Sequence, residues 1–496
     1  MGVTVENIIL ISSILLLISV IASKTSARFG VPALALFLGL GMLAGSEGIG
    51  GIYFDDPQIA QFIGIVALSS ILFSGGLETN WTTIKPVLWQ GITLSTLGVL
   101  LTAVTLGVFV WALTDFTLYE GLLLGSIVSS TDAAAVFSIL RSKNLALKNN
   151  LRPTLELESG SNDPMAYVLT LVFLGLVINP EQSLAAMIPL FLQQMVVGAA
   201  GGFAFGLVSK WIVNRIDLDF EGLYIVLMVA LAYITFSTTD FLGGNGFLAV
   251  YLCAVYLGNQ NFMHKVTILK MFDALAWLMQ IVLFLTLGLL VFPSHVVPVV
   301  GLGLLISVFL MLVARPLSVL LALSLFKMRF RRRMYISWAG LRGAVPIVFA
   351  TYPMLAGIDK AGMIFNLVFF ISLTSVLLQG TTLSVMARWL QVALPEEARK
   401  KNPTDMLLSE KIKAALTEVQ IPANSFAVDK KIVHLGFPST ALIAMIQRDN
   451  AYMTPNGSTE IKADDVLFVL SEQEDSIRQV YESLKITPPE SEQLVS

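Results

Sequence analysis

Apolar stretches recur along most of the chain, and at about twenty residues each is long enough to cross a hydrocarbon core of roughly 30 Å as a helix. Charged residues are correspondingly scarce, at 13% of the chain, whereas a soluble domain carries about 25%. Most of the surface is therefore expected to face membrane lipid. The pattern predicts an all-α polytopic membrane protein.

The apolar blocks predict about thirteen spans, at residues 6–22, 31–47, 59–77, 86–113, 119–140, 156–178, 187–209, 222–239, 245–258, 272–292, 297–325, 333–351 and 361–386. Lysine and arginine gather in the short connections after the odd-numbered blocks, and the alternate connections are mostly acidic. Because basic loops stay in the cytoplasm, we expect the N-terminus outside and the C-terminus inside. The first block begins at Glu6 and has no Lys or Arg before it, so we expect a retained span rather than a signal peptide.

The composition changes after Leu394, where the apolar blocks end. The predicted parts are a membrane domain at 1–394, a charged linker at 395–404, a small α+β cytoplasmic domain at 405–485 and a disordered tail at 486–496. Within the small domain we expect helices over 411–419 and 472–484 and strands over 441–446 and 466–470.

Charge and cysteine content exclude several other classes. The net charge of -3 gives no reason to expect a nucleic-acid partner. Cys253 is the single cysteine, and one cysteine can form neither an internal disulfide nor a zinc site. A potassium channel is unsupported, because no carbonyl-lined filter such as TVGYG is present.

Ionisable side chains inside the predicted spans are few. Each costs roughly 2.5–3.5 kcal/mol at the bilayer centre, so such residues usually mark a pathway. The residues concerned are Glu78, Asp132, Glu158, Asp163, Arg315 and Arg342. Glu78 follows a Gly-Gly pair and either lines a cytoplasmic entrance or caps its span. Arg315 either pairs within the bundle, snorkels to the interface or takes part in transport.

Two of these residues lie where a span is expected to break. Asp132 follows Ser129, Ser130 and Thr131, whose hydroxyls compete for backbone hydrogen bonds. Arg342 stands between two glycines and shortly before Pro346. A matched pair of interrupted spans indicates a midplane site in an inverted-repeat transporter. Asp132 would offset the positive helix N-termini and Arg342 the negative C-termini; the alternative is a polar contact between helices.

The segment from Glu158 to Pro164 carries the densest polar cluster in a span. Ser159 and Asp163 are four residues apart and share one helical face, as do Glu158 and Asn162. A carboxylate, an amide and a hydroxyl suit an oxygen-liganded cation. Apolar surroundings favour the neutral form of a carboxyl group, so a proton can compete with the cation for this site. The alternative is that Asp163 begins a helix, with Pro164 in its first turn.

At these residues the sequence resembles the monovalent cation/proton antiporters of the NhaP type. Thr131-Asp132, the run from Glu158 to Asp163 and Arg342 after Gly340-Leu341 are similar to the family's three motifs, in the same order. The resemblance implies a non-enzymatic transporter of the cell inner membrane that acts in pH homeostasis. It also implies a homodimer, two crossing broken helices, and a six-helix core that moves against a dimerisation domain.

The resemblance also assigns roles to single residues. It implies that K⁺ or Na⁺ binds at Asp163, Ser159, the Thr131 carbonyl and Glu78, with Asp132 and Asn162 completing the site. It implies a structural ion pair between Glu158 and Arg342. Asn162 stands where electrogenic relatives have a second aspartate, which favours electroneutral exchange of one cation for one proton. No cofactor is expected.

The tail resembles the C-terminal half of an RCK regulator, the TrkA-C fold, at residues 443–448 and 455–466. K⁺/H⁺ antiporters of this group carry this domain, so its presence favours K⁺ over Na⁺ as the exchanged ion, and some relatives bind a nucleotide such as cyclic di-AMP. Arg448 is the candidate for a phosphate contact, with a solvated arginine as the alternative. No GxGxxG follows a strand, so NAD is not expected. Three alternatives stay open: Na⁺/H⁺ exchange, a tail that serves assembly only, and a ligand-gated cation channel.

Overall fold

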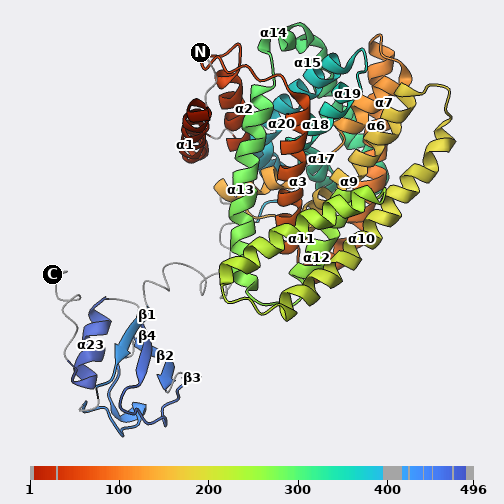
Figure 1. Ribbon diagram of the computed structural model, residues 1–496. Helices are drawn as coiled ribbons and strands as arrows, with labels where there is room; N and C mark the ends of the chain where they lie inside the picture. Colours follow the sequence, from red (N-terminus) through yellow and green to blue (C-terminus); the bar gives the residue numbers. More distant parts are fainter. Residues whose placement is uncertain are drawn as a thin grey trace. The chain divides into compact units, whose positions relative to one another are not determined.

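The structure is a computed structural model, and it describes residues 5–29, 32–143, 145–394, 416–422, 425–438, 441–448, 451–471 and 474–486. The chain divides into two compact units, Met1–Leu394 and Pro395–Ser496. The first is helical and the second contains a small sheet (Figure 1). Each unit is described by itself below.

The helices of the first unit follow one another with short connections. Their bounds are α1 Val5–Phe29, α2 Ala33–Ala44, α3 Pro57–Glu78, α4 Trp81–Ile84, α5 Leu88–Thr93, α6 Val99–Leu113, α7 Leu118–Ile127, α8 Ala133–Ser142, α9 Leu151–Ile178, α10 Ile188–Arg215, α11 Glu221–Phe241, α12 Gly246–Gly258, α13 Lys265–Leu289, α14 Pro293–Val296, α15 Val300–Phe309, α16 Arg315–Ala322, α17 Phe330–Trp338, α18 Val345–Phe349, α19 Thr351–Leu355 and α20 Ala361–Trp389. Single turns of other helix types join α4 to α5, α5 to α6 and α15 to α16.

Length and composition make eight helical stretches of the described chain long and apolar enough to cross a membrane. Five shorter apolar helices accompany them, at Ile9–Lys24, Ala33–Ala44, Leu118–Ile127, Gly246–Gly258 and Val345–Leu355. Every predicted apolar block overlaps one stretch of either kind, although the blocks at 119–140 and 333–351 overlap theirs only in part. The prediction of a mostly helical chain with many candidate spans is confirmed.

Both predicted interruptions are present. The first lies between α7, which ends at Ile127, and α8, which begins at Ala133. The second lies between α17, which ends at Trp338, and α18, which begins at Val345. The Asp132 amide donates a 2.8 Å hydrogen bond to the Leu341 carbonyl. Two segments more than two hundred residues apart in the chain therefore meet backbone to backbone.

Small residues allow the helices around the first break to pack closely. A Cβ atom added at Gly125 of α7 would stand 2.2 Å from the Ala103 carbonyl oxygen of α6. Gly107 and Gly121 approach each other in the same way along these two helices. Close backbone contact of this kind is typical of helices that associate in lipid. It holds α7 in place just before the helix is interrupted.

The second unit contains a four-stranded antiparallel sheet in the order β1-β4-β2-β3. Its elements are β1 Leu416–Gln420, β2 Ala441–Arg448, β3 Ala451–Met453, β4 Val466–Ser471 and the helix α23 Glu474–Leu484. Apolar side chains of the sheet and α23, among them Ile446, Leu467 and Val480, form a separate core. The prediction of a small α+β domain is confirmed, including strands at β2 and β4 and the terminal helix.

One predicted element of this domain is wrong. The helix expected over 411–419 is a strand from Leu416 onward, because β1 pairs with β4 along its whole length. The backbone hydrogen bonds of that ladder outweigh a weak local helix propensity. Residues 411–415, the linker 395–404 and residues 487–496 lie outside the described part of the chain.

Candidate functional site

The candidate site lies where the first break contacts α9. This helix runs without interruption from Leu151 to Ile178 and carries Asp163 and Pro164 in its middle. The alternative that Asp163 begins a helix is therefore wrong. Proline has no N–H to donate, so the Gly160 carbonyl lacks its usual partner within the helix beside Asp163.

Three side chains of α9 fasten the broken segment. The Ser159 hydroxyl donates to the Thr131 carbonyl at 2.8 Å and accepts from the Ala133 amide at 2.8 Å. The Asn162 amide donates to the Thr131 hydroxyl. The Asp163 carboxylate accepts a hydrogen bond from the Ser130 hydroxyl. The polar side chains of α9 thus supply the partners that the backbone of a continuous helix would have had.

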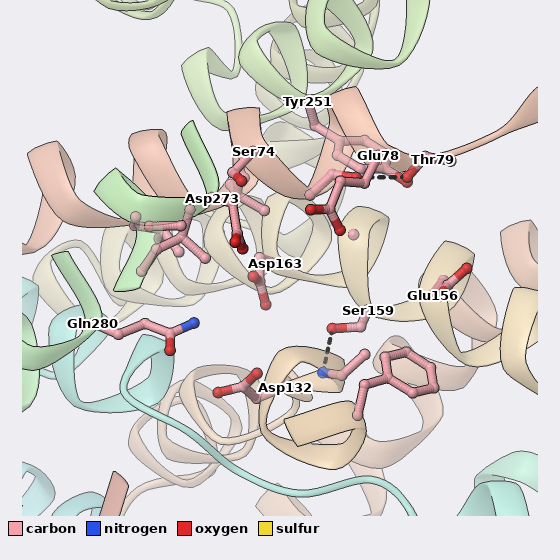
Figure 2. Close-up of a pocket in the computed structure, with 18 of the residues that line it drawn as sticks. Ser74, Glu78, Thr79, Asp132, Glu156, Ser159, Asp163, Tyr251, Asp273 and Gln280 are labelled. Atoms are coloured by element: carbon pink, nitrogen blue, oxygen red, sulfur yellow. Dashed lines mark hydrogen bonds between the residues drawn. The ribbon is translucent and has the colours of Figure 1, made fainter. Parts of the chain in front are cut away.

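Asp132 completes the start of α8. It is the N-cap residue of this helix, and its carboxylate accepts from the Ala135 amide at 3.0 Å. A carboxylate at this position compensates the positive end of the helix dipole, as the sequence predicts. Figure 2 shows Asp132 and Asp163 facing the same open space, with Ser159 between the helices that carry them.

That space is a cavity of about 490 Å³. Asp132, Ser159 and Asp163 line it at one end, and Glu78, the last residue of α3, lies further along it (Figure 2). Its other polar lining residues include Glu156, Asp273, Gln280, Arg141 and Arg152. Carboxylate, hydroxyl and amide oxygens are the ligands that hard cations prefer, so the lining fits a cation pathway that ends at Asp163.

Two predicted ligands lie outside this lining. Asn162 is fully buried, and both Thr131 oxygens receive its amide group. The Thr131 carbonyl also accepts from Ser159. The structure therefore brings Asp163, Ser159 and Asp132 together at the cavity. Thr131 and Asn162 form the wall behind them.

The predicted ion pair between Glu158 and Arg342 is wrong in this structure. Glu158 pairs with Arg315 of α16, and both side chains are only 2% exposed. Arg342 instead donates from Nη1 to the carbonyls of Ser129 and Ser130, at 2.5 Å each. These carbonyls follow the C-terminus of α7, where the negative end of the helix dipole attracts a cation. Composition alone could not decide which of two buried arginines reaches Glu158.

Along α9 the lining of the cavity stops at Asp163, and aromatic side chains pack on the next turn of this helix. Tyr167 packs against Phe247, Phe349 and Tyr352, with ring centroids 5.2, 5.7 and 5.6 Å away. The Asn245 amide, at the start of α12, donates to the Pro164 carbonyl at 2.8 Å. The residues of α9 that line the cavity all lie at or before Asp163. Asp163 is thus reached from one side and covered on the other.

Sequence reasoning missed the direct partner of Asp163. It treated the Ser130 hydroxyl only as a helix breaker, yet this hydroxyl donates to the carboxylate. Asp273 and Gln280 of α13 were likewise not singled out as cavity residues. The signal for Ser130 was its place in the break beside the acidic residue. Asp273 and Gln280 carried no such signal.

In the tail domain, Arg448 is engaged rather than solvated. Its Nε and Nη2 donate to the two oxygens of Asp465, at 2.7 and 2.6 Å, and Nη2 also donates to the Glu460 carbonyl at 2.8 Å. Burial acts to raise the pKa of Asp465, but the hydrogen bonds from Arg448 and the Lys462 amide hold that pKa below its ordinary value. The arginine proposed for a phosphate contact therefore already holds a carboxylate.

A buried carboxylate that lines a cavity beside two interrupted helices that touch is typical of secondary transporters of ions. The chain belongs to the sodium/hydrogen exchanger family: the transmembrane model of that family matches residues 13–389. The TrkA-C domain model matches residues 416–485. The resemblance that the motifs indicated is confirmed, and with it a multi-pass membrane protein.

Similar proteins include a K⁺/H⁺ antiporter NhaP of Alkalimonas amylolytica, 38% identical over 469 residues that cover 94% of this chain and 81% of that protein. A K⁺/H⁺ antiporter NhaP2 of Shewanella sp. (strain ANA-3) is 38% identical over 473 residues, or 95% of this chain and 82% of the relative. Among solved structures, the sodium proton antiporter MjNhaP1 from Methanocaldococcus jannaschii has a TM-score of 0.66 at 24% identity, covering 74% of this chain and 97% of that one. The last likeness concerns the fold.

Proposed function

We propose that this protein exchanges K⁺, or Na⁺, for H⁺ across the cell inner membrane. The observation that carries the proposal is the Asp163 carboxylate, which closes the end of the cavity and is bound by Ser130. One carboxylate holds either a cation or a proton, and the two compete for it. Competition for a single site that faces one side at a time is sufficient for coupled exchange.

We propose alternating access because Asp163 faces the cavity on one side and covered aromatic packing on the other. The cavity runs from Asp163 toward Arg141 and Arg152, which lie in a connection expected to be cytoplasmic. Tyr167 and its aromatic neighbours cover the other side. In the proposed cycle a cytoplasmic cation displaces the proton from Asp163, and the covered side then opens to the outside.

The proposed architecture has about thirteen spans, the N-terminus outside and the C-terminus inside. An inverted repeat places the two breaks opposite each other, and the protein works as a homodimer whose six-helix core moves against the dimerisation domain. The contact between Asp132 and Leu341 supports a common core for both breaks. Glu78 lies along the cavity, where it attracts the incoming cation.

Two observations favour K⁺ as the cation and one-to-one exchange. The two relatives at 38% identity are named K⁺/H⁺ antiporters, and the tail of this chain matches the TrkA-C domain model. Asn162 contributes a neutral amide beside Asp163. With a single exchangeable carboxylate at the site, one cation replaces one proton and no net charge moves.

Proton flux in proteoliposomes tests the function. Adding K⁺ to vesicles that hold a pH gradient should dissipate the gradient, and Na⁺, Li⁺ and Rb⁺ compared in parallel give the preference. Exchange at one fixed K⁺ gradient is then compared with and without valinomycin, which imposes the K⁺ equilibrium voltage on the vesicle membrane. A rate that rises steeply with voltage would contradict electroneutral exchange, and cation flux without proton flux would indicate a channel.

The tail is proposed to regulate the exchange. A ligand bound by the tail can bias the transporter only if it prefers one of its states, and a nucleotide such as cyclic di-AMP is the candidate ligand. Deleting residues from Asp405 onward should preserve exchange and change its dependence on pH or nucleotide. An unchanged pH profile, with no response to nucleotide in either form, would leave assembly as the role of the tail.

A further inference from the structure

The second break is held by two side chains that do not line the cavity. Ser375 and Gln379 lie one turn apart on α20, and both are at most 2% exposed. The Arg342 amide donates to the Ser375 hydroxyl at 3.0 Å, and this hydroxyl donates to Gln379 Oε1 at 2.5 Å. Gln379 Nε2 then donates to the Trp338 carbonyl at 3.1 Å. The chain of bonds links Trp338, at the end of α17, to Arg342 inside the break.

The direction of every bond in this chain is determined by chemistry. A backbone amide only donates and a carbonyl only accepts, so Arg342 and Trp338 fix the two ends. Ser375 must accept from Arg342 and donate onward, and Gln379 must turn its amide nitrogen to Trp338. Serine and glutamine each supply the one donor and one acceptor that the chain requires, and an apolar residue at either position interrupts it.

The same chain reaches the proposed cation site through Arg342. The Arg342 guanidinium donates to the carbonyls of Ser129 and Ser130, and the Ser130 hydroxyl donates to Asp163. A shift of the Arg342 backbone therefore moves the segment that carries Ser130. Buried hydrogen-bond networks transmit such changes because an unsatisfied group is costly in apolar surroundings.

We infer that Ser375 and Gln379 are positioning residues that set the cation affinity of the Asp163 site. They hold the Arg342 backbone, and Arg342 holds the segment that presents Ser130 to the carboxylate. The inference rests on the proposed exchange function and adds two residues of α20 to its machinery. Neither residue touches the cation in this arrangement.

The test compares Ser375→Ala with Ser372→Ala in purified protein reconstituted into vesicles. Ser372 lies on the same helix, is equally buried, and its hydroxyl has no hydrogen-bond partner among the described residues. We expect Ser375→Ala to raise the KM for K⁺ about tenfold, as loss of one buried hydrogen bond predicts, and to shift the pH profile of exchange. Ser372→Ala should match the parent protein, and Ser375→Thr should restore the KM to within about twofold, since it keeps the hydroxyl.

Two results would overturn the inference. One is a Ser375→Ala protein with the KM and pH profile of Ser372→Ala. The other is a Ser375→Ala protein whose melting temperature falls while its KM and pH profile stay those of the parent. If Ser375→Ala does not fold, Gln379→Met is measured instead, and a KM and pH profile like the parent's would overturn the inference equally. Absence of exchange in the parent protein would refute the proposed function, whereas normal exchange with an unaltered Ser375→Ala variant would refute only this inference.

Discussion

The two interrupted spans meet at one backbone hydrogen bond but are completed by different parts of the molecule. Side chains of α9 complete the first break, and Ser159 and Asp163 among them also line the cavity. Side chains of α20 complete the second, and Ser375 and Gln379 lie away from that lining. The side chains that form hydrogen bonds with the first break therefore include the ones that an ion can reach. The second break meets the lining only through the apolar residue Ala344, next to Val345 of α18, and Arg342 gives this break a buried positive charge.

The largest expected effect comes from the first break. Asp163→Asn keeps the size of the side chain and its contact with Ser130, but removes the charge that proton and cation share. We expect exchange to fall to the background of protein-free vesicles while the melting temperature stays near that of the parent. Exchange at a normal rate in the folded variant would remove Asp163 from the site.

The ion pair beside the two breaks should dominate stability instead. Breaking a buried pair by removing one partner costs about 3–5 kcal/mol, so Glu158→Gln and Arg315→Gln should each lower the melting temperature strongly. Because these two side chains are partners, the double variant should lose much less than the sum of the single losses.

A second double-mutant cycle, in which Glu158 and Arg342 are changed singly and together, sharpens the comparison with the Glu158–Arg315 pair. Arg342 donates to backbone carbonyls rather than to Glu158, so its coupling to Glu158 should be the smaller of the two. Thermal unfolding of all five variants measures both couplings under the same conditions. A larger coupling for Arg342 than for Arg315 would restore the ion pair expected from the sequence.

A variant on the covered side of Asp163 tests how firmly that side is closed. Asn245→Ala removes the hydrogen bond to the Pro164 carbonyl, at a cost of about 1 kcal/mol. We expect faster amide hydrogen exchange in the part of α9 that follows Asp163, with the part before it unchanged. If the variant and the parent exchange amide hydrogens at the same rate in the part after Asp163, Asn245 does not hold that side closed.

The smallest effect is expected in the tail domain, far from either break in the chain. The pKa of Asp465 lies below its ordinary value, so the bonds from Arg448 stabilise the domain above pH 4 or so and are lost as the pH falls through that lowered pKa. Asp465→Asn should destabilise the domain at pH 7 and make its stability less dependent on acid. Hydrogen exchange of residues 416–486 in the whole protein, at pH 7 and at about pH 2, well below the ordinary pKa of an aspartate, measures both changes. Equal acid sensitivity of parent and variant would contradict the pair.

The sequence by itself indicated a mostly helical membrane protein, the two breaks and the polar residues that gather at the cavity. Apolar blocks of span length, the hydroxyl run before Asp132 and the glycines around Arg342 are local features, and a helix in lipid must satisfy its backbone from within. The positions of both breaks followed from local composition, and the grouping of Ser159 with Asp163 on one helical face followed from their spacing.

Tertiary structure decided which partners these groups choose. Two buried arginines compete for Glu158, and only packing brings Arg315 to it while Arg342 reaches Ser129 and Ser130. The role of Ser375 in holding the second break depends on contacts across more than thirty residues. Such pairings are set by the approach of helices far apart in the chain, for which composition and periodicity carry no information.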